Sequence, residues 1–297
     1  MKIFDGQHKA VAQIIGNNKK QIQCLIFVEP NIAKLREVIY QAHTDLVQQK
    51  YKKSHIDAKL ADIYKQKIED FRKRVNNPDA PYSEYDIMNG ESKANITKFL
   101  LSSIIDEIKN ERSFIREHVA QDKIEQKNKP VLWQSLERLV SVFCNLQPVS
   151  YPSNDNQNFR SEEIENICFI LDQIEEFSIK GKWNPDNSDA EHHVLARTYY
   201  YRTAFNNWIE ILEKALRFSY ESMRNKAIEG SLCYREPFDS NIKHRFITVI
   251  KKLFDSPLWV IPEIQKNIST ANKDAVVGDI FKQQGMDYIY LTKISQN

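Results

Sequence analysis

The sequence predicts a mainly helical protein with a small α/β portion at its N-terminus. Apolar residues recur at spacings of three and four along most long segments, which is the period of a helix with one buried face. Glycine is scarce, with seven in 297 residues, so few breaks are expected inside these segments. An apolar run at residues 21–28 is instead typical of a strand.

The α/β portion is predicted over residues 1–75. Its first element is a tight turn at Asp5-Gly6, followed at once by an amphipathic helix. The strand at residues 21–28 comes next. Two polar helices, over residues 31–53 and 55–75, complete this portion.

A cluster of asparagine and proline at residues 76–81 separates this portion from the rest of the chain, because such clusters break helices. A helical domain is predicted over residues 82–297. Its apolar periodicity indicates helices over residues 96–108, 131–146, 161–174, 190–226 and 241–254, with a short apolar run at 288–291.

Several helix starts can be assigned from residue type. Pro130 is expected in the first turn of its helix, where a missing N–H costs nothing. Ser161 is expected to cap the next helix, with acidic residues in the first turn. Asp189 is expected to cap the longest helix, with Glu191 following in its first turn.

Composition excludes several classes of protein. Forty-two Lys and Arg against 40 Asp and Glu give a formal charge of +2, so any nucleic-acid contact must come from local patches. The chain has neither a signal-peptide pattern nor an apolar run long enough to span a bilayer, so we expect a soluble, cytoplasmic protein without a membrane partner. The cysteines are too scattered for a disulfide framework or zinc ribbon and are expected to be buried free thiols: Cys24, Cys144, Cys168 and Cys233.

The first candidate site is the turn Asp5-Gly6-Gln7-His8-Lys9. Gly6 permits close backbone approach to a ligand, and the free N–H groups of the following helix face any anion bound there. In this interpretation Lys9 contacts phosphate, Gln7 and His8 donate hydrogen bonds, and Asp5 faces a metal or braces the loop. The alternative is a solvated Asp-Gly turn.

This five-residue segment resembles the signature of the DGQHR-domain proteins, which include the DndB-type proteins of DNA phosphorothioation systems and belong to the ParB-like superfamily. A more distant likeness is to the GmrS-type restriction proteins. The resemblance covers residues 1 to about 75. It departs from the family at Lys9, where a point charge replaces the planar arginine, and in having only four residues before the motif. We expect a chain that begins late or a truncated relative; the alternatives are that a partner supplies the missing strands or that the pocket is vestigial.

The resemblance implies a DNA-associated regulatory or accessory protein of a DNA-modification or phage-defence system, which binds DNA and has no catalytic residues. The rival from another class is a nucleotide hydrolase of the GmrS type, which would use the same loop on a nucleotide with magnesium. A third possibility is a structural partner that completes the fold of another chain or of a second copy.

Two further segments are candidates for nucleic-acid contact. Basic residues gather on the two predicted polar helices, where they form a stripe for phosphates or an ordinary solvated face: Lys50, Lys52, Lys53, Lys65, Lys67, Arg72, Lys73 and Arg74. The segment at residues 197–202 has three consecutive tyrosines between two arginines, a composition found where bases stack. We expect Tyr201 and Trp208 to pack inside, leaving Arg197 and Tyr200 at the surface.

Metal and nucleophile sites have little support in the sequence. One acidic and histidine-rich run matches no tabulated ligand spacing and is better explained by helix capping: Asp186, Asp189, Glu191, His192 and His193. No nucleophile-elbow or phosphate-loop motif is present. The other histidines are isolated on helical segments and are expected to be structural or exposed: His43, His55, His118 and His244.

Overall fold

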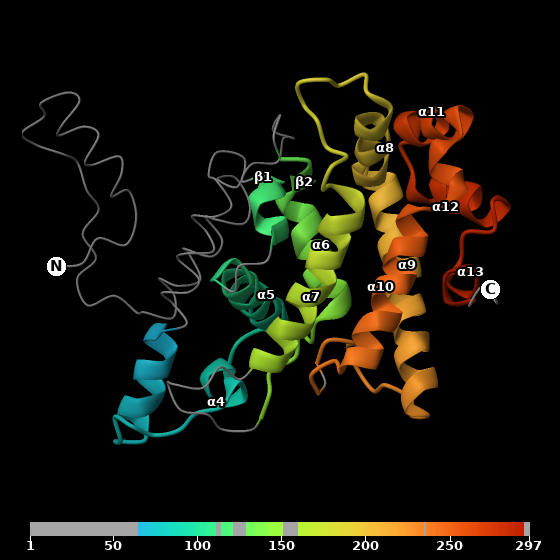
Figure 1. Ribbon diagram of the computed structural model, residues 1–297. Coiled ribbons are helices and arrows are strands. Elements are labelled where there is room, and N and C mark those ends of the chain that lie inside the picture. Colours follow the sequence, from blue (N-terminus) through green and yellow to red (C-terminus); the bar gives the residue numbers. More distant parts are fainter. Residues whose placement is uncertain (1–64, 111–113, 121–128, 151–159, 235, 294–297) are drawn as a thin grey trace, which may run out of the picture. The chain divides into compact units, whose positions relative to one another are not determined.

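The computed structural model describes residues 65–110, 114–120, 129–150, 160–234 and 236–293, and these are mainly helical, as predicted (Figure 1). All of them belong to one compact unit, Tyr51–Asn297. The predicted N-terminal strand lies outside the described residues. No helix in the described ranges has both the length and the apolarity needed to cross a membrane.

A first helix at residues 65–74 is followed by the labelled elements of Figure 1. The α-helices are α4 (Glu84–Met88), α5 (Lys93–Asn110), α6 (Trp133–Phe143), α7 (Ser161–Ser178), α8 (Glu191–Tyr200), α9 (Arg202–Arg224), α10 (Ser240–Phe254), α11 (Pro262–Thr270), α12 (Asp274–Gln283) and α13 (Tyr288–Thr292). The shorter elements are η1 (Phe114–His118), β1 (Val119–Ala120), β2 (Val131–Leu132) and η2 (Pro257–Val260).

Helix α9 is the centre of the helical packing. It contacts α6, α8, α10, α12 and α13, while α10 also packs on α7, and α7 on α5 (Figure 1). The core beside α9 is aromatic, with the rings of Trp208, Tyr199 and Phe254 meeting edge to face. The indole N–H of Trp208 donates to the Tyr199 carbonyl oxygen at 2.8 Å, so this fully buried polar atom is satisfied.

Three of the expected helices are confirmed as α5, α7 and α10. Their predicted apolar faces are the buried ones, for example Phe99 and Ile104 on α5 and Ile167 and Leu171 on α7. The expected turn at residues 76–81 is also present, although the proposed domain boundary there stays a prediction. The final apolar run forms α13, which Asp287 caps by accepting a hydrogen bond from the Tyr290 N–H.

The longest predicted helix, residues 190–226, was wrong as a single element. It is two helices, α8 and α9, separated at Tyr201, whose backbone is extended with φ −57° and ψ 131°. The break ends the helical hydrogen bonding beyond Tyr199, which is how its carbonyl oxygen can accept from Trp208. Side-chain packing therefore outweighs the helical preference of the sequence at this point.

Three expected helix starts were also wrong. Pro130 precedes β2, and α6 begins only at Trp133, because Val131 and Leu132 pair in parallel with Val119 and Ala120 of β1. The N-cap of α7 is Arg160, not Ser161, and that of α8 is Ala190, not Asp189. Neither cap residue makes a side-chain capping bond, so packing sets both starts.

Candidate nucleic-acid interface

The predicted site residues are divided between described and undescribed parts of the chain. The motif Asp5-Gly6-Gln7-His8-Lys9 and the basic residues Lys52 and Lys53 lie outside the described residues. Arg72, Lys73 and Arg74 lie in the last turn of the helix at residues 65–74, and Arg197 and Tyr200 lie on α8.

The helix at residues 65–74 ends in a Schellman motif. Asn76 has the left-handed φ of 53°, and its N–H donates to the Lys73 carbonyl at 3.2 Å. The Asn77 N–H reaches back to the Arg72 carbonyl at 3.1 Å. Three cations in the last turn also suit the negative end of the helix dipole, so the local sequence stabilises this helix end without any ligand.

The side chains of this basic turn have different environments. The Arg72 Nε donates to the Ala80 carbonyl at 3.4 Å, and the guanidinium lies 5.4 Å from the Tyr82 ring centroid. Arg74 lies over Phe71, with its Nη2 3.5 Å from the Asp86 carbonyl oxygen, and is exposed, as is Lys73. Arg72 therefore holds the following turn in place, whereas Lys73 and Arg74 face solvent.

Lys67, which the sequence placed in the same basic stripe, belongs to the packing instead. Its Nζ is buried, bonds to Glu91 Oε1 at 2.5 Å and lies 5.5 Å from the Phe99 ring centroid. The stripe is therefore shorter than the sequence suggests.

The tyrosine segment is positioned by the break between α8 and α9. Tyr199 is the tyrosine that faces the core, and its hydroxyl donates to the Phe254 carbonyl at 2.8 Å. The expected packing of Trp208 is confirmed, but Tyr201 is only half-buried. Arg197 is exposed, with its guanidinium carbon 5.9 Å from the Tyr201 ring centroid.

Tyr200 is half-buried and held from two sides. Its hydroxyl lies 2.7 Å from Ser178 Oγ, and its ring stacks on Phe205 at 6.3 Å with a 28° tilt. Burial raises the pKa of the Tyr200 hydroxyl above its ordinary value, so this group stays protonated at neutral pH. The Tyr200 side chain therefore has a fixed position and carries no charge.

Two cavities adjoin this segment. The first, of about 490 Å³, is lined by one residue of β2, three of α6, one of α8, five of α9 and one of α12: Leu132, Gln134, Ser135, Arg138, Tyr200, Arg202, Phe205, Asn206, Asn207, Glu210 and Asp274. The second, of about 520 Å³, is lined by Tyr201, Arg202 and Thr203 and by six residues of the segment 268–274. Because both include Arg202 and Asp274, we treat them together as the Arg202 cleft.

Charges around the Arg202 cleft are only partly paired. Arg138 Nη2 contacts Glu210 Oε1 at 2.6 Å. The Asp274 carboxylate accepts from Asn206 Nδ2 at 3.0 Å. By contrast, the side chain of Arg202 makes no hydrogen bond or ion pair with the part of the chain that the structure describes.

Lys273 and Arg197 share this property. Their side chains likewise form neither ion pairs nor hydrogen bonds within the described ranges, and Lys273 lines the second cavity with Tyr201. Arg197 contacts the ring of Tyr201. Three cations without a direct ion pair in the described ranges thus lie near Tyr201: Arg202 and Lys273 line a cavity with it, and Arg197 lies over its ring.

Sequence reasoning missed Arg138, Lys273 and the Asn206-Asn207 pair. Lys273 is an isolated lysine far along the chain, and only the packing of α12 on α9 brings it to Arg202. An asparagine pair early in a helix was the one available signal, since asparagine is uncommon there without a specific hydrogen-bond partner. Asn207 Nδ2 indeed donates to the Thr203 and Asp274 carbonyls, both at 2.8 Å.

The histidine-rich run around α8 has a structural explanation. His193 is buried, its Nδ1 accepts from the Asn184 N–H at 2.9 Å, and its ring lies 4.3 Å from that of Trp183. Within the described residues, no group of three or more His, Cys, Asp or Glu is arranged to hold a metal ion.

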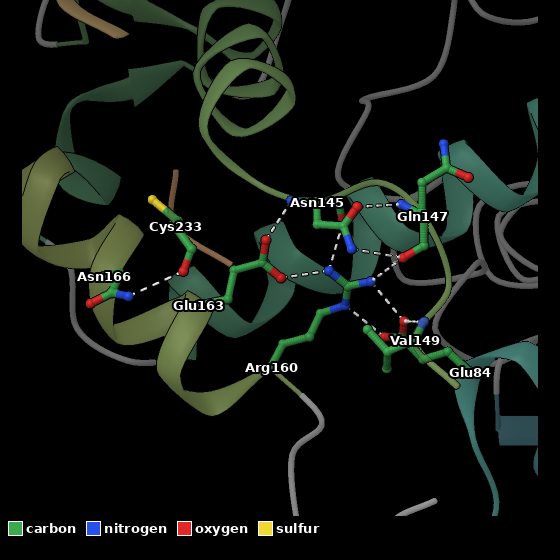
Figure 2. Close-up of polar contacts among 8 residues, drawn as sticks. All are labelled: Glu84, Asn145, Gln147, Val149, Arg160, Glu163, Asn166 and Cys233. Atoms are coloured by element: carbon green, nitrogen blue, oxygen red, sulfur yellow. Dashed lines mark hydrogen bonds and ion pairs between the residues drawn. The ribbon is translucent and has the colours of Figure 1, made fainter. Parts of the chain in front are cut away.

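A buried ion network, which sequence reasoning also missed, centres on Arg160 (Figure 2). Its Nε and Nη2 contact the two carboxylate oxygens of Glu84, both at 2.6 Å, and its Nη1 contacts Glu163 at 2.5 Å. The remaining donors reach the carbonyls of Asn145 at 2.6 Å and Gln147 at 2.9 Å.

All five N–H groups of Arg160 are therefore used. Burial raises the pKa of Glu163, although Arg160 acts in the opposite direction. The network joins α4, the segment after α6 and the start of α7, and it leaves no arginine donor for a ligand. We therefore assign it to stability.

Comparisons with protein-family models, curated proteins and solved structures find no match to this chain.

Proposed function

We propose that this chain is a DNA-associated regulatory or accessory protein that binds DNA rather than reacting with it. The observation that carries the proposal is a group of three cations without an ion pair in the described ranges: Arg202 and Lys273 line one cavity with Tyr201, and Arg197 lies over the ring of that tyrosine. Unpaired cations bind phosphates at low desolvation cost, and an adjacent aromatic ring offers a surface for a base.

The basic turn supports the same proposal. Lys73 and Arg74 are exposed and project from a capped helix end, so they are held in a defined place. With a formal charge of only +2, the chain needs such local groups to attract DNA. Arg72 takes the lesser role of positioning the turn from which they project.

The cellular context rests on the motif at residues 5–9. Its resemblance to DGQHR-domain proteins favours a cytoplasmic role in DNA modification or phage defence, with transcriptional control as one form of regulation. The same motif favours a second candidate, a nucleotide hydrolase. That activity would require magnesium and would be lost in Asp5→Ala and His8→Ala, whereas DNA binding through the Arg202 cleft would survive both substitutions.

The test is binding of a fluorescent duplex oligonucleotide by the purified chain across a series of salt concentrations. We compare the natural protein with Arg197→Ala/Arg202→Ala and with Lys73→Ala/Arg74→Ala. The matched control is Lys214→Ala/Lys226→Ala, which removes two exposed lysines of α9 and its C-terminal end.

Removal of one cation that binds a phosphate should reduce the slope of log affinity against log salt by about 0.9. The first two variants should therefore bind more weakly and with a shallower slope, and the control should not. Absence of binding even at low salt, by the duplex and by each of its separated strands, would overturn the proposal. The structural-partner alternative would then be tested by whether the isolated chain self-associates.

A further inference from the structure

We propose that the Arg202 cleft takes one unstacked base of single-stranded DNA, with the flanking phosphates on Arg197, Arg202 and Lys273. This inference rests on the proposed DNA association and narrows its ligand. It follows from three features of the cleft: the distribution of charge, the aromatic wall and the free hydrogen-bonding groups.

The first cavity has little net charge. Its two arginines are balanced by two carboxylates, and Arg138 is already paired with Glu210 at 2.6 Å. A groove that follows a phosphate backbone needs excess positive charge, which this cavity lacks. Its interior therefore suits a neutral group, such as a base, better than a phosphate.

The second cavity has the opposite character. It contains Arg202 and Lys273 against one carboxylate, and that carboxylate accepts a hydrogen bond from Asn206. Arg197 adds a further cation beside Tyr201. The phosphates on either side of a bound base would meet these three cations, while the base enters the neighbouring first cavity.

The wall of the first cavity is suited to stacking. Tyr200 lines it with a ring fixed by Ser178 and backed by Phe205, so the ring loses little freedom when a base lies on it. The volume of about 490 Å³ lies within the range of small-ligand sites, which is large enough for a base and its sugar.

Polar groups in the cavity can read the edge of a base. The side chains of Gln134 and Ser135 line it and make no hydrogen bond with the described parts of the chain. The exposed carboxylates of Glu210 and Asp274 can accept from an exocyclic amine. In a duplex these edges are engaged in base pairs and the faces are stacked, so an unpaired base is the form that fits.

The experiment compares three probes of equal length by fluorescence anisotropy: a single-stranded oligodeoxynucleotide, its duplex, and a deoxyribose-phosphate oligomer without bases. We expect the single strand to bind at least about tenfold more tightly than the other two, since one stacked base contributes on that order. This comparison needs no variant protein.

Two sets of substitutions then separate base from phosphate. Tyr200→Leu should weaken the single strand about tenfold and leave the abasic oligomer unchanged, because the stacking surface is lost while Arg197, Arg202 and Lys273 remain. Gln134→Ala/Ser135→Ala should also weaken binding of the single strand, and it should not disturb the core because neither side chain is buried. Arg202→Ala should weaken both probes, because it removes a cation that either backbone can contact, and the control Lys214→Ala should weaken neither.

The outcomes distinguish the two proposals. Equal binding of all three probes would overturn the base-binding inference and leave DNA association standing. If none of the three probes bound, both proposals would be overturned. A single-strand preference that persists in Tyr200→Leu and in Gln134→Ala/Ser135→Ala would also overturn the assignment of the base to this cleft.

Discussion

Replacement of Arg160 by methionine should destabilise the protein more than loss of any single exposed cation. The guanidinium is 4% exposed and pairs with two carboxylates that are themselves nearly inaccessible, those of Glu84 and Glu163. Methionine fills a similar volume but leaves both carboxylates buried without a cation. Removing one partner of a buried ion pair costs about 3–5 kcal/mol, and we expect a value in this range.

This cost is a large share of the total stability of a domain, which is about 5–15 kcal/mol. The measurement is urea-induced unfolding followed by tryptophan fluorescence, with the midpoint and slope fitted together. The matched control is Arg224→Met. Arg224 pairs with Asp239 at 3.0 Å, but both side chains are more than a third exposed, so its loss should cost no more than about 1 kcal/mol.

Glu84→Gln is a less disruptive variant, which can be measured even if Arg160→Met does not fold. Glu84→Gln retains the shape and one acceptor while removing one charge from the network. In the double variant Arg160→Met/Glu84→Gln one of the two uncompensated carboxylates is gone, so its cost should fall below the sum of the two single costs. The reasoning would be refuted if Arg160→Met were no more destabilising than Arg224→Met, or if the two substitutions were simply additive.

Three other predictions concern the core and the titrating groups. Leu212→Ala, at a fully buried position of α9, should lower the free energy of unfolding by about 2–5 kcal/mol, measured by the same urea titration. Burial raises the pKa of the Cys144 and Cys233 thiols, so a thiol reagent followed by peptide mass spectrometry should label both only after unfolding. Burial likewise raises the pKa of Tyr199 and Tyr200, so their contribution to stability is complete below the ordinary tyrosine pKa of about 10 and is lost as the pH rises above it. Tyr199→Phe and Tyr200→Phe should each reduce that alkaline loss of stability, measured by unfolding at increasing pH, and an unchanged loss in both would contradict the assignment.

Apolar periodicity was sufficient to predict α5, α7 and α10, because each buries one face and the spacing of its apolar residues records that face directly. Helix starts were less predictable. Ser161 has the favoured residue type for a cap, yet the chain enters α7 one residue earlier because Arg160 is held by Glu84 and Glu163. Glu84 is 76 residues away from Arg160 in the sequence. Glu163 has the spacing of a capping box but contacts the Arg160 side chain, and arginine is not a capping residue type, so no local rule could identify this helix start.

The strands β1 and β2 also could not be predicted from the sequence. Each has two residues, and their parallel pairing joins Val119 to Val131 and Ala120 to Leu132. A two-residue strand carries no alternation that could be recognised in a sequence. Val131 and Leu132 also continue the apolar spacing of α6, which is why the helix was predicted to start too early.

The Arg202 cleft also depends on a feature that the sequence pattern does not reveal, the break between α8 and α9. In a continuous helix, residues two apart point about 200° away from each other around the axis, so Tyr200 and Arg202 would face different sides of the molecule. The extended backbone at Tyr201 removes this constraint, and both residues line one cavity. That break is stabilised from the core, where the Tyr199 carbonyl accepts the Trp208 indole N–H.

The break between α8 and α9 therefore determines which residues line the Arg202 cleft. Trp208→Phe keeps an aromatic ring in the core but removes the indole donor, so the Tyr199 carbonyl loses its partner at the break. If this hydrogen bond positions the cleft, the variant should lose single-strand affinity while retaining its helical content by circular dichroism. A variant that bound as tightly as the natural protein would show that the break persists without the Trp208 bond, and that the packing of α8 and α9 on their neighbours is enough to form the cleft.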